Sequence, residues 1–180
     1  LLIQTDGKII LAGSHHNGST QDFAIVRYNS NGSLDNSFDT DGKLTTAIGS
    51  SDDIAYSIAM QTDGKIVVAG QSDISGNNDF VLVRYNSNGS LDNSFDTDGK
   101  LTISIGFAQD EAALAIQANG NILIAGSNGS NFIAARFNAN GSLDNTFDGD
   151  GIAITPVGIA SSAEATSMEI ETDGKILVAG

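Results

Sequence analysis

Three short acidic turns of the sequence combine residue types that can bind a cation. Each has the form Asp-x-Asp-Gly, in which alternate carboxylates and a glycine resemble the middle of a calcium-binding loop. The six carboxylates are Asp39, Asp41, Asp96, Asp98, Asp148 and Asp150. No glutamate follows at the far end of these loops, so the full EF-hand pattern is absent, and an Asp-Gly step also simply forms turns. We therefore expect either a calcium site or a plain turn, and the missing glutamate favours the turn.

A second acidic series precedes segments that are rich in small residues. It comprises Asp53, Asp110 and Glu164, one in each of three successive units of the chain. If these units gather around a common axis, the three carboxylates form a ring at one mouth of a central channel. Such a ring focuses its field and could bind a cation or a positively charged ligand. The alternative, which we favour, is ordinary solvated charge on loops.

Arginine and aspartate recur together at a fixed spacing of eight residues. The pairs are Arg27 with Asp35, Arg84 with Asp92, and Arg136 with Asp144. A guanidinium presents a rigid fork of donors that can join a carboxylate and loop carbonyls. All eight basic residues of the chain fall in such repeated positions, whereas a catalytic lysine or arginine would more plausibly occur once. We expect each pair to be a structural tether that holds a long connection to its own unit.

Other residue types that support catalysis occur without the partners that they would need. His15 and His16 are the only histidines, and adjacent residues of a strand point to opposite sides, so a shared zinc ion is not expected. Serines are plentiful, but no Gly-x-Ser-x-Gly elbow is present. No Walker or dinucleotide-binding glycine motif occurs either. We expect no catalytic residue and no cofactor, with calcium as the one candidate.

The whole chain is built from a repeat of roughly 55 residues. The turn Gln-Thr-Asp-Gly-Lys, or a close variant, occupies residues 4–8, 61–65, 117–121 and 171–175. The stretch RYNSNGSLDNSFDTDGKLT occurs at residues 27–45 and returns unchanged at residues 84–102. The acidic turns and the Arg–Asp pairs are therefore parts of the repeat.

The second unit, residues 51–107, has the alternating pattern of short strands. The strands are predicted at residues 55–61, 65–70, 79–86 and 100–106. Asp63 and Gly64 are expected to supply the two positive-φ positions of a type I′ hairpin between the first two strands. A polar loop at residues 71–78 follows the second strand, and its composition differs from unit to unit.

These strands predict an all-β fold, a β-propeller built of four-stranded antiparallel blades. A small sheet cannot bury both faces alone, so the units must stack on one another. The first strand carries the small side chains of Ala55, Ser57 and Ala59, which fit near a crowded axis. The aromatic rings of Phe80, Phe95 and Phe107 are expected further out. A β-solenoid, the main alternative, usually has a shorter repeat.

The chain contains about three and a half of these blades, all of one propeller domain. Residues 1–50 form a blade whose first strand is mostly missing, residues 51–107 and 108–159 form complete blades, and residues 160–180 form the inner half of a further blade. A closed ring typically has about 4 to 8 blades. We therefore expect the remaining blades to come from a longer parent chain, or else from other copies joined head to tail. Both ends lie inside the pattern, which favours a longer chain.

The segments DIAYSIAMQTDGK, DGKIVVAG and DFVLVRYNSNGSLDNSFDTDGKLT resemble the delta-60 repeat, a bacterial propeller repeat of large secreted or surface proteins. The resemblance covers essentially the whole chain. It implies a β-propeller, an extracellular or cell-surface location, and no established biochemical activity. The third unit departs from the pattern, because QANGNILIAG lacks the Asp and Lys of the turn.

Composition excludes some classes of partner. The chain has 22 acidic residues against 8 basic ones and a net charge of −14, so it repels nucleic acids and anionic lipid headgroups. No apolar run approaches the roughly 20 residues that a membrane-spanning helix needs. Cysteine is absent, so the redox compartment stays open.

The sequence supports three classes of function. Loops that differ on a repeated frame usually carry binding specificity, so the first is a non-catalytic module for binding or adhesion to a protein or glycan. Its variable loops are SHHNGSTQ, QSDISGNN and SNGSN. The second is a purely structural spacer in a large surface protein. The third, which we rank last, is a carbohydrate-active lyase or hydrolase that uses channel carboxylates such as Asp53 and Asp110.

Overall fold

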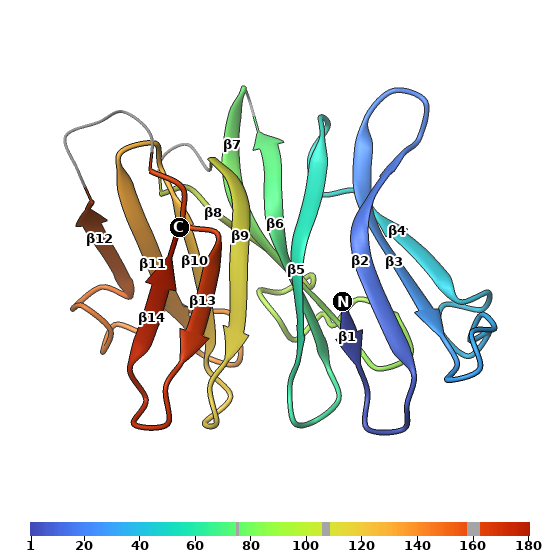
Figure 1. The fold of residues 1–180 in the computed structure, drawn as a ribbon. Coiled ribbons are helices and arrows are strands. Elements are labelled where there is room, and N and C mark those ends of the chain that lie inside the picture. Colours follow the sequence, from blue (N-terminus) through green and yellow to red (C-terminus); the bar gives the residue numbers. More distant parts are fainter. Residues whose placement is uncertain (75, 106–108, 158–162) are drawn as a thin grey trace.

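The computed structural model describes residues 1–74, 76–105, 109–157 and 163–180, apart from the side chains of residues 109–111. All regular structure in these residues is β (Figure 1). It forms three four-stranded sheets and one two-stranded sheet, and every pairing is antiparallel. No helix in this described part of the chain is long and apolar enough to cross a membrane.

Each sheet is made from strands that are consecutive in the chain. The first sheet contains β1 (Leu2–Ile3), β2 (Ile9–His16), β3 (Gln21–Tyr28) and β4 (Lys43–Thr46). The second contains β5 (Asp53–Met60), β6 (Ile66–Ile74), β7 (Asn77–Tyr85) and β8 (Lys100–Ile103). The third contains β9 (Gln109–Ile116), β10 (Ile122–Ser127), β11 (Asn131–Phe137) and β12 (Ile152–Pro156). The fourth contains only β13 (Ser167–Ile170) and β14 (Ile176–Ala179).

The turn between β5 and β6 differs from the predicted type I′ hairpin. Gly64 N donates to Gln61 O at 2.9 Å, and Gln61 N donates to Lys65 O at 2.8 Å. Gly64 has φ +85°, but Asp63 is not left-handed. This is a type I turn followed by a glycine bulge, a common form of the slightly longer hairpin. Asp63 contributes its side chain instead, since its Oδ1 accepts the Lys65 N–H at 3.1 Å.

The hydrophobic core lies between neighbouring sheets. One cluster joins the first and second sheets and includes Phe23, Ile25, Val68, Val83 and Tyr85. The other joins the second and third sheets and includes Val67, Leu82, Phe95, Ile122 and Phe137. Because β6 and β7 are covered on both faces, each contains a central apolar run without alternation, IVVA in β6 and FVLV in β7. Phe80 and Phe95 are buried in the second cluster, and Phe107 lies outside the described residues.

The first strands of the sheets line one edge of the row. β5 contacts β1, β2 and β9, and β9 contacts β13. Ala55 and Ala112 are buried at this edge, where small side chains were predicted. Gly70 on β6 is tightly enclosed, because a Cβ atom there would overlap the Ile54 carbonyl oxygen and lie 2.7 Å from Phe23 Cζ.

The sheets stand face to face in an open row and do not close into a ring (Figure 1). The predicted fold, about three and a half four-stranded blades of a β-propeller, is confirmed. The hairpins β2–β3, β6–β7 and β10–β11 lie along one edge of the row, which we call the variable rim. The Gln-x-x-Gly hairpins and the long third-to-fourth strand connections lie along the opposite edge, the repeat rim.

Candidate functional site

The Arg–Asp pairs form compact clusters on the repeat rim. In the second sheet, Arg84 Nε lies 2.7 Å and Lys65 Nζ 2.9 Å from Asp92 Oδ2. Arg84 Nη2 donates to Ser94 Oγ at 3.2 Å, and the guanidinium stacks 4.6 Å from the centre of the Phe95 ring. Asp92 is buried, and the cations of Lys65 and Arg84 balance its charge in place of solvent. This arrangement holds the long connection against its own blade.

The first sheet repeats this cluster almost atom for atom. Arg27 Nε lies 2.7 Å and Lys8 Nζ 3.1 Å from Asp35 Oδ2. The Arg27 guanidinium lies 4.6 Å from the centre of the Phe38 ring. In both sheets the arginine and the aspartate of the pair are thus in direct contact within one blade.

The third sheet departs from the cluster where the sequence departs from the repeat. Arg136 Nε lies 2.8 Å from Asp144 Oδ2, but Asn121 takes the place of the lysine and donates to the same oxygen at 2.9 Å. The Arg136 side chain is 19% exposed, compared with 4% for Arg84. Arg136 is thus the least enclosed of the three arginines.

The arginines also join one blade to the next, which the spacing did not predict. Arg27 Nη1 donates to Ser87 O in the second sheet at 2.6 Å, and Arg84 Nη1 donates to Ala139 O in the third. The tether was expected to act within its own unit. The guanidinium has further donors, and the neighbouring sheet brings a backbone carbonyl within their reach.

Each aspartate of these clusters has a pKa below its usual range. For Asp35 and Asp144 the main cause is the hydroxyl hydrogen bond from Ser37 and Thr146 respectively. For Asp92, burial alone would raise the pKa, but hydrogen bonds from Lys65 and Ser94 and the charge of Arg84 outweigh it and lower the pKa. These carboxylates therefore stay ionised and act as hydrogen-bond acceptors.

The six aspartates proposed for calcium are all exposed. The second carboxylate of each turn accepts a backbone N–H two residues later, as Asp41 Oδ1 does from Lys43 N at 2.9 Å. The first has a left-handed backbone, with φ +44° at Asp39 and +42° at Asp96. Among the described residues, no group of three or more acidic or histidine side chains lies close enough to hold a metal ion.

The left-handed aspartates have a structural use. Asp39 N donates to Asn88 O at 2.9 Å, and Asp96 N donates to Asn140 O at 3.2 Å. Both acceptors belong to the following sheet. The unusual backbone turns these N–H groups toward the neighbouring blade, so the acidic turns are contacts between blades.

Asp53 fits neither of the two interpretations considered for the second acidic series, a ring at the channel mouth or solvated charge on a loop. Asp53 is 0% exposed and is the first residue of β5, where its side chain is enclosed by the preceding connection and by β6. Its carboxylate accepts hydrogen bonds from Ile48 N at 2.7 Å, from Gly49 N at 3.3 Å and from Ser72 Oγ. The Asp53 carboxylate is buried and already accepts hydrogen bonds from backbone and hydroxyl donors. The prediction that Asp53 faces a ligand is therefore wrong. Glu164 is exposed, and the side chain of Asp110 lies outside the described residues.

The variable rim is made of hairpins rather than of loose loops. The strand pairing of β2 and β3 extends to His16 and Gln21, and that of β6 and β7 extends to Ile74 and Asn77. His15 and His16 are exposed, and His16 Nδ1 accepts the N–H of Gly18 at 3.1 Å. The segments predicted as loops therefore project as ribbons from rigid sheets.

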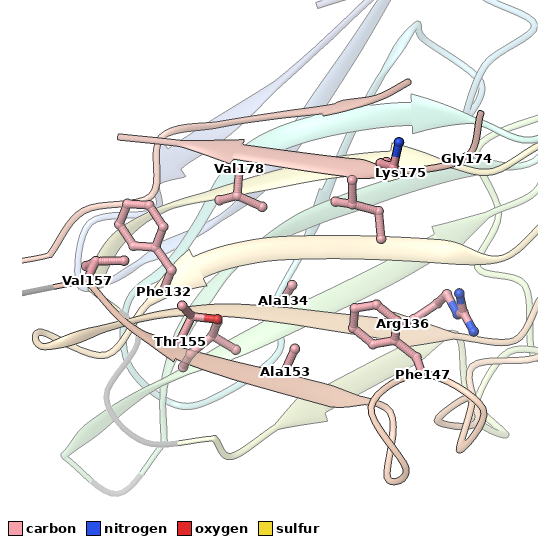
Figure 2. A pocket seen from close by; sticks show the side chains of 12 residues that line it. Phe132, Ala134, Arg136, Phe147, Ala153, Thr155, Val157, Gly174, Lys175 and Val178 are labelled. Atoms are coloured by element: carbon pink, nitrogen blue, oxygen red, sulfur yellow. The ribbon is translucent and has the colours of Figure 1, made fainter. Parts of the chain in front are cut away.

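One further feature, a cavity of about 720 Å³ beside the third sheet, was missed by the sequence reasoning (Figure 2). Its walls come from β11, β12 and β14 and include Phe132, Ala134, Thr155 and Val178. The signal that could have found it is the half blade at residues 160–180, because two strands cannot cover a neighbour that has four.

Comparison with known proteins gives one family. A family model described as "Domain of unknown function (DUF5122) beta-propeller" matches residues 4–38, 61–95 and 117–147, which together make up more than half of the chain. No curated protein matches the chain. Each matched segment begins at the Gln-x-x-Gly turn and ends at the phenylalanine under the arginine, so the family pattern spans the second and third strands, the variable hairpin between them and the Arg–Asp cluster.

Proposed function

The chain belongs to the DUF5122 beta-propeller family, and from that premise we propose that it is a non-catalytic binding module whose specificity lies in the variable rim. The hairpin segments 14–21, 71–78 and 127–131 differ in composition and the third is shorter, whereas the turns and the long connections of the repeat rim are largely repeated. Variation concentrated at one edge of a rigid frame is the arrangement that binding surfaces use. This contrast between the two rims is the observation that supports the proposal.

The side chains of the first variable hairpin suit a polar ligand. Ser14, His15, His16 and Asn17 are exposed, and most of them carry both donors and acceptors. The three variable segments contain no lysine or arginine, so an anionic ligand has no cation to bind there. We propose a glycan or a protein as the ligand. The resemblance to the delta-60 repeat supports an extracellular or cell-surface location in bacteria.

The repeat rim supports a second candidate, a structural spacer. Its arginines, its buried aspartates and the backbone of its acidic turns are engaged within and between blades, as Arg27 is with Asp35 and Ser87. Because the polar groups of this rim already bind one another, the rim stabilises the stacking of blades. In a spacer, the hairpins of the variable rim would have no ligand.

The binding function is tested by exchanging hairpins of the variable rim. Binding of the variants to a glycan array and to a panel of extracellular proteins is then measured. Segments 14–21 and 71–78 have equal length, so each can replace the other without a change in register. We expect the exchange to abolish or redirect binding. As a control, QANGN at residues 117–121 is replaced by QTDGK on the repeat rim, and binding should persist.

Binding that survives the replacement of all three hairpins would contradict the variable rim as the binding surface. The absence of any ligand, together with an elongated particle in small-angle scattering of the parent protein, would favour the spacer.

A further inference from the structure

The cavity beside the third sheet lies between the outer face of β11 and β12 and the facing side of β14 (Figure 2). Phe132, Ala134, Ala153 and Thr155 line one wall, and Ile176 and Val178 line the other. The walls are mainly apolar. A cavity of this kind is a place where packing partners are missing, because apolar faces of stacked blades are normally covered.

The equivalent faces of the two preceding sheets are covered in the same way. On the first sheet, Phe23 and Ile25 are buried against Val81, Val83 and Tyr85 of β7. On the second sheet, Phe80 and Leu82 are buried against β11 of the third sheet, chiefly Ile133, Ala135 and Phe137. In both cases the third strand of the next blade supplies the cover. The fourth sheet has only its first two strands, and this third strand is the element that would fill the cavity.

Two hydrogen-bond donors of the third sheet, Arg136 Nη1 and Asp148 N, also indicate that this third strand is missing. Arg27 and Arg84 donate from Nη1 to a carbonyl that follows the third strand of the next blade. Asp39 N and Asp96 N donate to the carbonyl of the next residue along, Asn88 or Asn140. For Arg136 Nη1 and Asp148 N, no such acceptor is present among the residues that the structure describes.

We propose that this cavity is the docking site for the third and fourth strands of a further repeat unit, joined in register to β14, and that this third strand carries Arg-Tyr where β11 carries Arg-Phe. The segment that follows the strand would supply the carbonyls for Arg136 and Asp148. The proposal is independent of whether the variable rim binds a ligand.

The tyrosine follows from a pairing that changes along the chain. Tyr85 OH bonds to Thr46 Oγ1 at 2.8 Å across the first interface, and both residues are buried. At the second interface, Ile103 takes the place of Thr46 and Phe137 takes that of Tyr85 in one apolar cluster. The third position of this series is Thr155, which lines the cavity. A buried threonine hydroxyl needs a partner, so the matching residue is tyrosine.

The test appends the sequence of residues 14–48 of this chain directly after Gly180. Gly13 and Gly180 occupy the same place in the repeat, as the last residues of DGKIILAG and DGKILVAG respectively, so the extension enters in register. It contains Arg27-Tyr28 at the required position. We expect the extension to slow amide hydrogen exchange of residues 132–136 and to raise the melting temperature.

Thr155→Val removes the hydroxyl and keeps the side-chain shape. In the extended chain we expect it to raise the equilibrium constant for unfolding about fivefold, which is the effect of losing one buried hydrogen bond. In the unextended chain we expect no such change. The matched variant has phenylalanine at the appended copy of Tyr28. It should weaken the extended chain to the same degree, and the two changes together should cost no more than either alone.

Three results would overturn the proposal. Unaltered exchange at residues 132–136 in the extended chain would show that the extension does not dock there. Equal effects of Thr155→Val with and without the extension would rule out the Tyr–Thr pair. Finally, concentration-dependent protection of the same residues in the unextended chain would assign the cavity to a second copy of this chain.

Discussion

The Arg27 guanidinium donates a hydrogen bond of 2.6 Å to the carbonyl oxygen of Ser87, sixty residues further along the chain and in the next sheet. The same guanidinium holds Asp35 in its own sheet at 2.7 Å. One side chain thus ties a connection to its blade and that blade to its neighbour. The repetition of this arrangement at Arg84 explains why the arginine, the aspartate and the connection recur together.

Replacement of Arg84 should destabilise the protein more than replacement of Arg136. Arg84→Ala leaves buried Asp92 short of a cation and removes the bond to Ala139 O, so we expect a loss of about 3–5 kcal/mol. Arg136 is more exposed and contacts no carbonyl of a following blade among the described residues, so Arg136→Ala should cost clearly less. Urea unfolding of both variants measures the difference, and equal losses would contradict the role of the contact between blades.

Stability should fall at acid pH because of the clustered aspartates. Asp35, Asp92 and Asp144 have pKa values lowered in the folded protein. A lowered pKa contributes stability that is fully present above the unfolded value, near 3.9, and that is lost as the pH falls toward the folded value. We expect unfolding free energies to be level from pH 7 to about 5 and to decline below about 4.

Asp92→Asn tests whether these groups cause the decline. The variant should be less stable than the parent at pH 7, and its stability should depend less on pH below about 4. Denaturant titrations at several pH values measure both effects. An unchanged slope would show that other carboxylates dominate acid unfolding.

The left-handed backbone of the acidic turns predicts a stabilising substitution. Thr97 has φ +71°, which is unfavourable for a β-branched residue, and the third repeat has Gly149 at this place. Thr97→Gly should raise stability by about 0.5–1 kcal/mol, because relief of the strain exceeds the entropic cost of glycine. The reverse change, Gly149→Thr, should lower it. Thermal unfolding of the two variants would contradict this account if both shifts had the same sign.

Gly70 and Gly13 occupy the same position in two repeats but differ in their surroundings. A Cβ at residue 70 would collide with the Ile54 carbonyl and with Phe23, whereas nothing lies within 4 Å of one at residue 13. Gly70→Ala should therefore cost about 1–3 kcal/mol, and Gly13→Ala should be close to neutral. The midpoints of urea unfolding of the two variants measure this difference. Similar losses for both would mean that glycine serves the hairpin and not the contact between sheets.

Calcium should have little effect on stability. The second aspartates of the acidic turns already accept backbone N–H groups, and a ligand that binds only the folded state must raise its stability. We expect the melting temperature to be the same in calcium and in chelator. A rise of several degrees on addition of calcium would assign Asp39, Asp96 and their partners to a metal site after all.

The sequence predicted the features that depend on local pattern. Alternation gave the strands, the recurring turn gave the blade, and the spacing of Arg84 and Asp92 gave their contact, because all of these act within one unit. The type of the turn at Asp63 was predicted wrongly. A type I′ turn and a type I turn with a bulge share the Asp-Gly signal, and they differ in loop length and in the handedness of the backbone at Asp63.

Only the tertiary structure decided how surfaces of different units meet. It buried the Asp53 carboxylate between Gly49 of the preceding connection and Ser72 of β6, and it brought Ser87 to Arg27. It also left the wall around Thr155 uncovered. Spacing along a chain fixes what lies within one blade, but burial and contacts between blades depend on the stacking of faces that are far apart in sequence. For this reason the scaffold could be inferred from the residues alone, whereas the cavity and the contacts between blades could not.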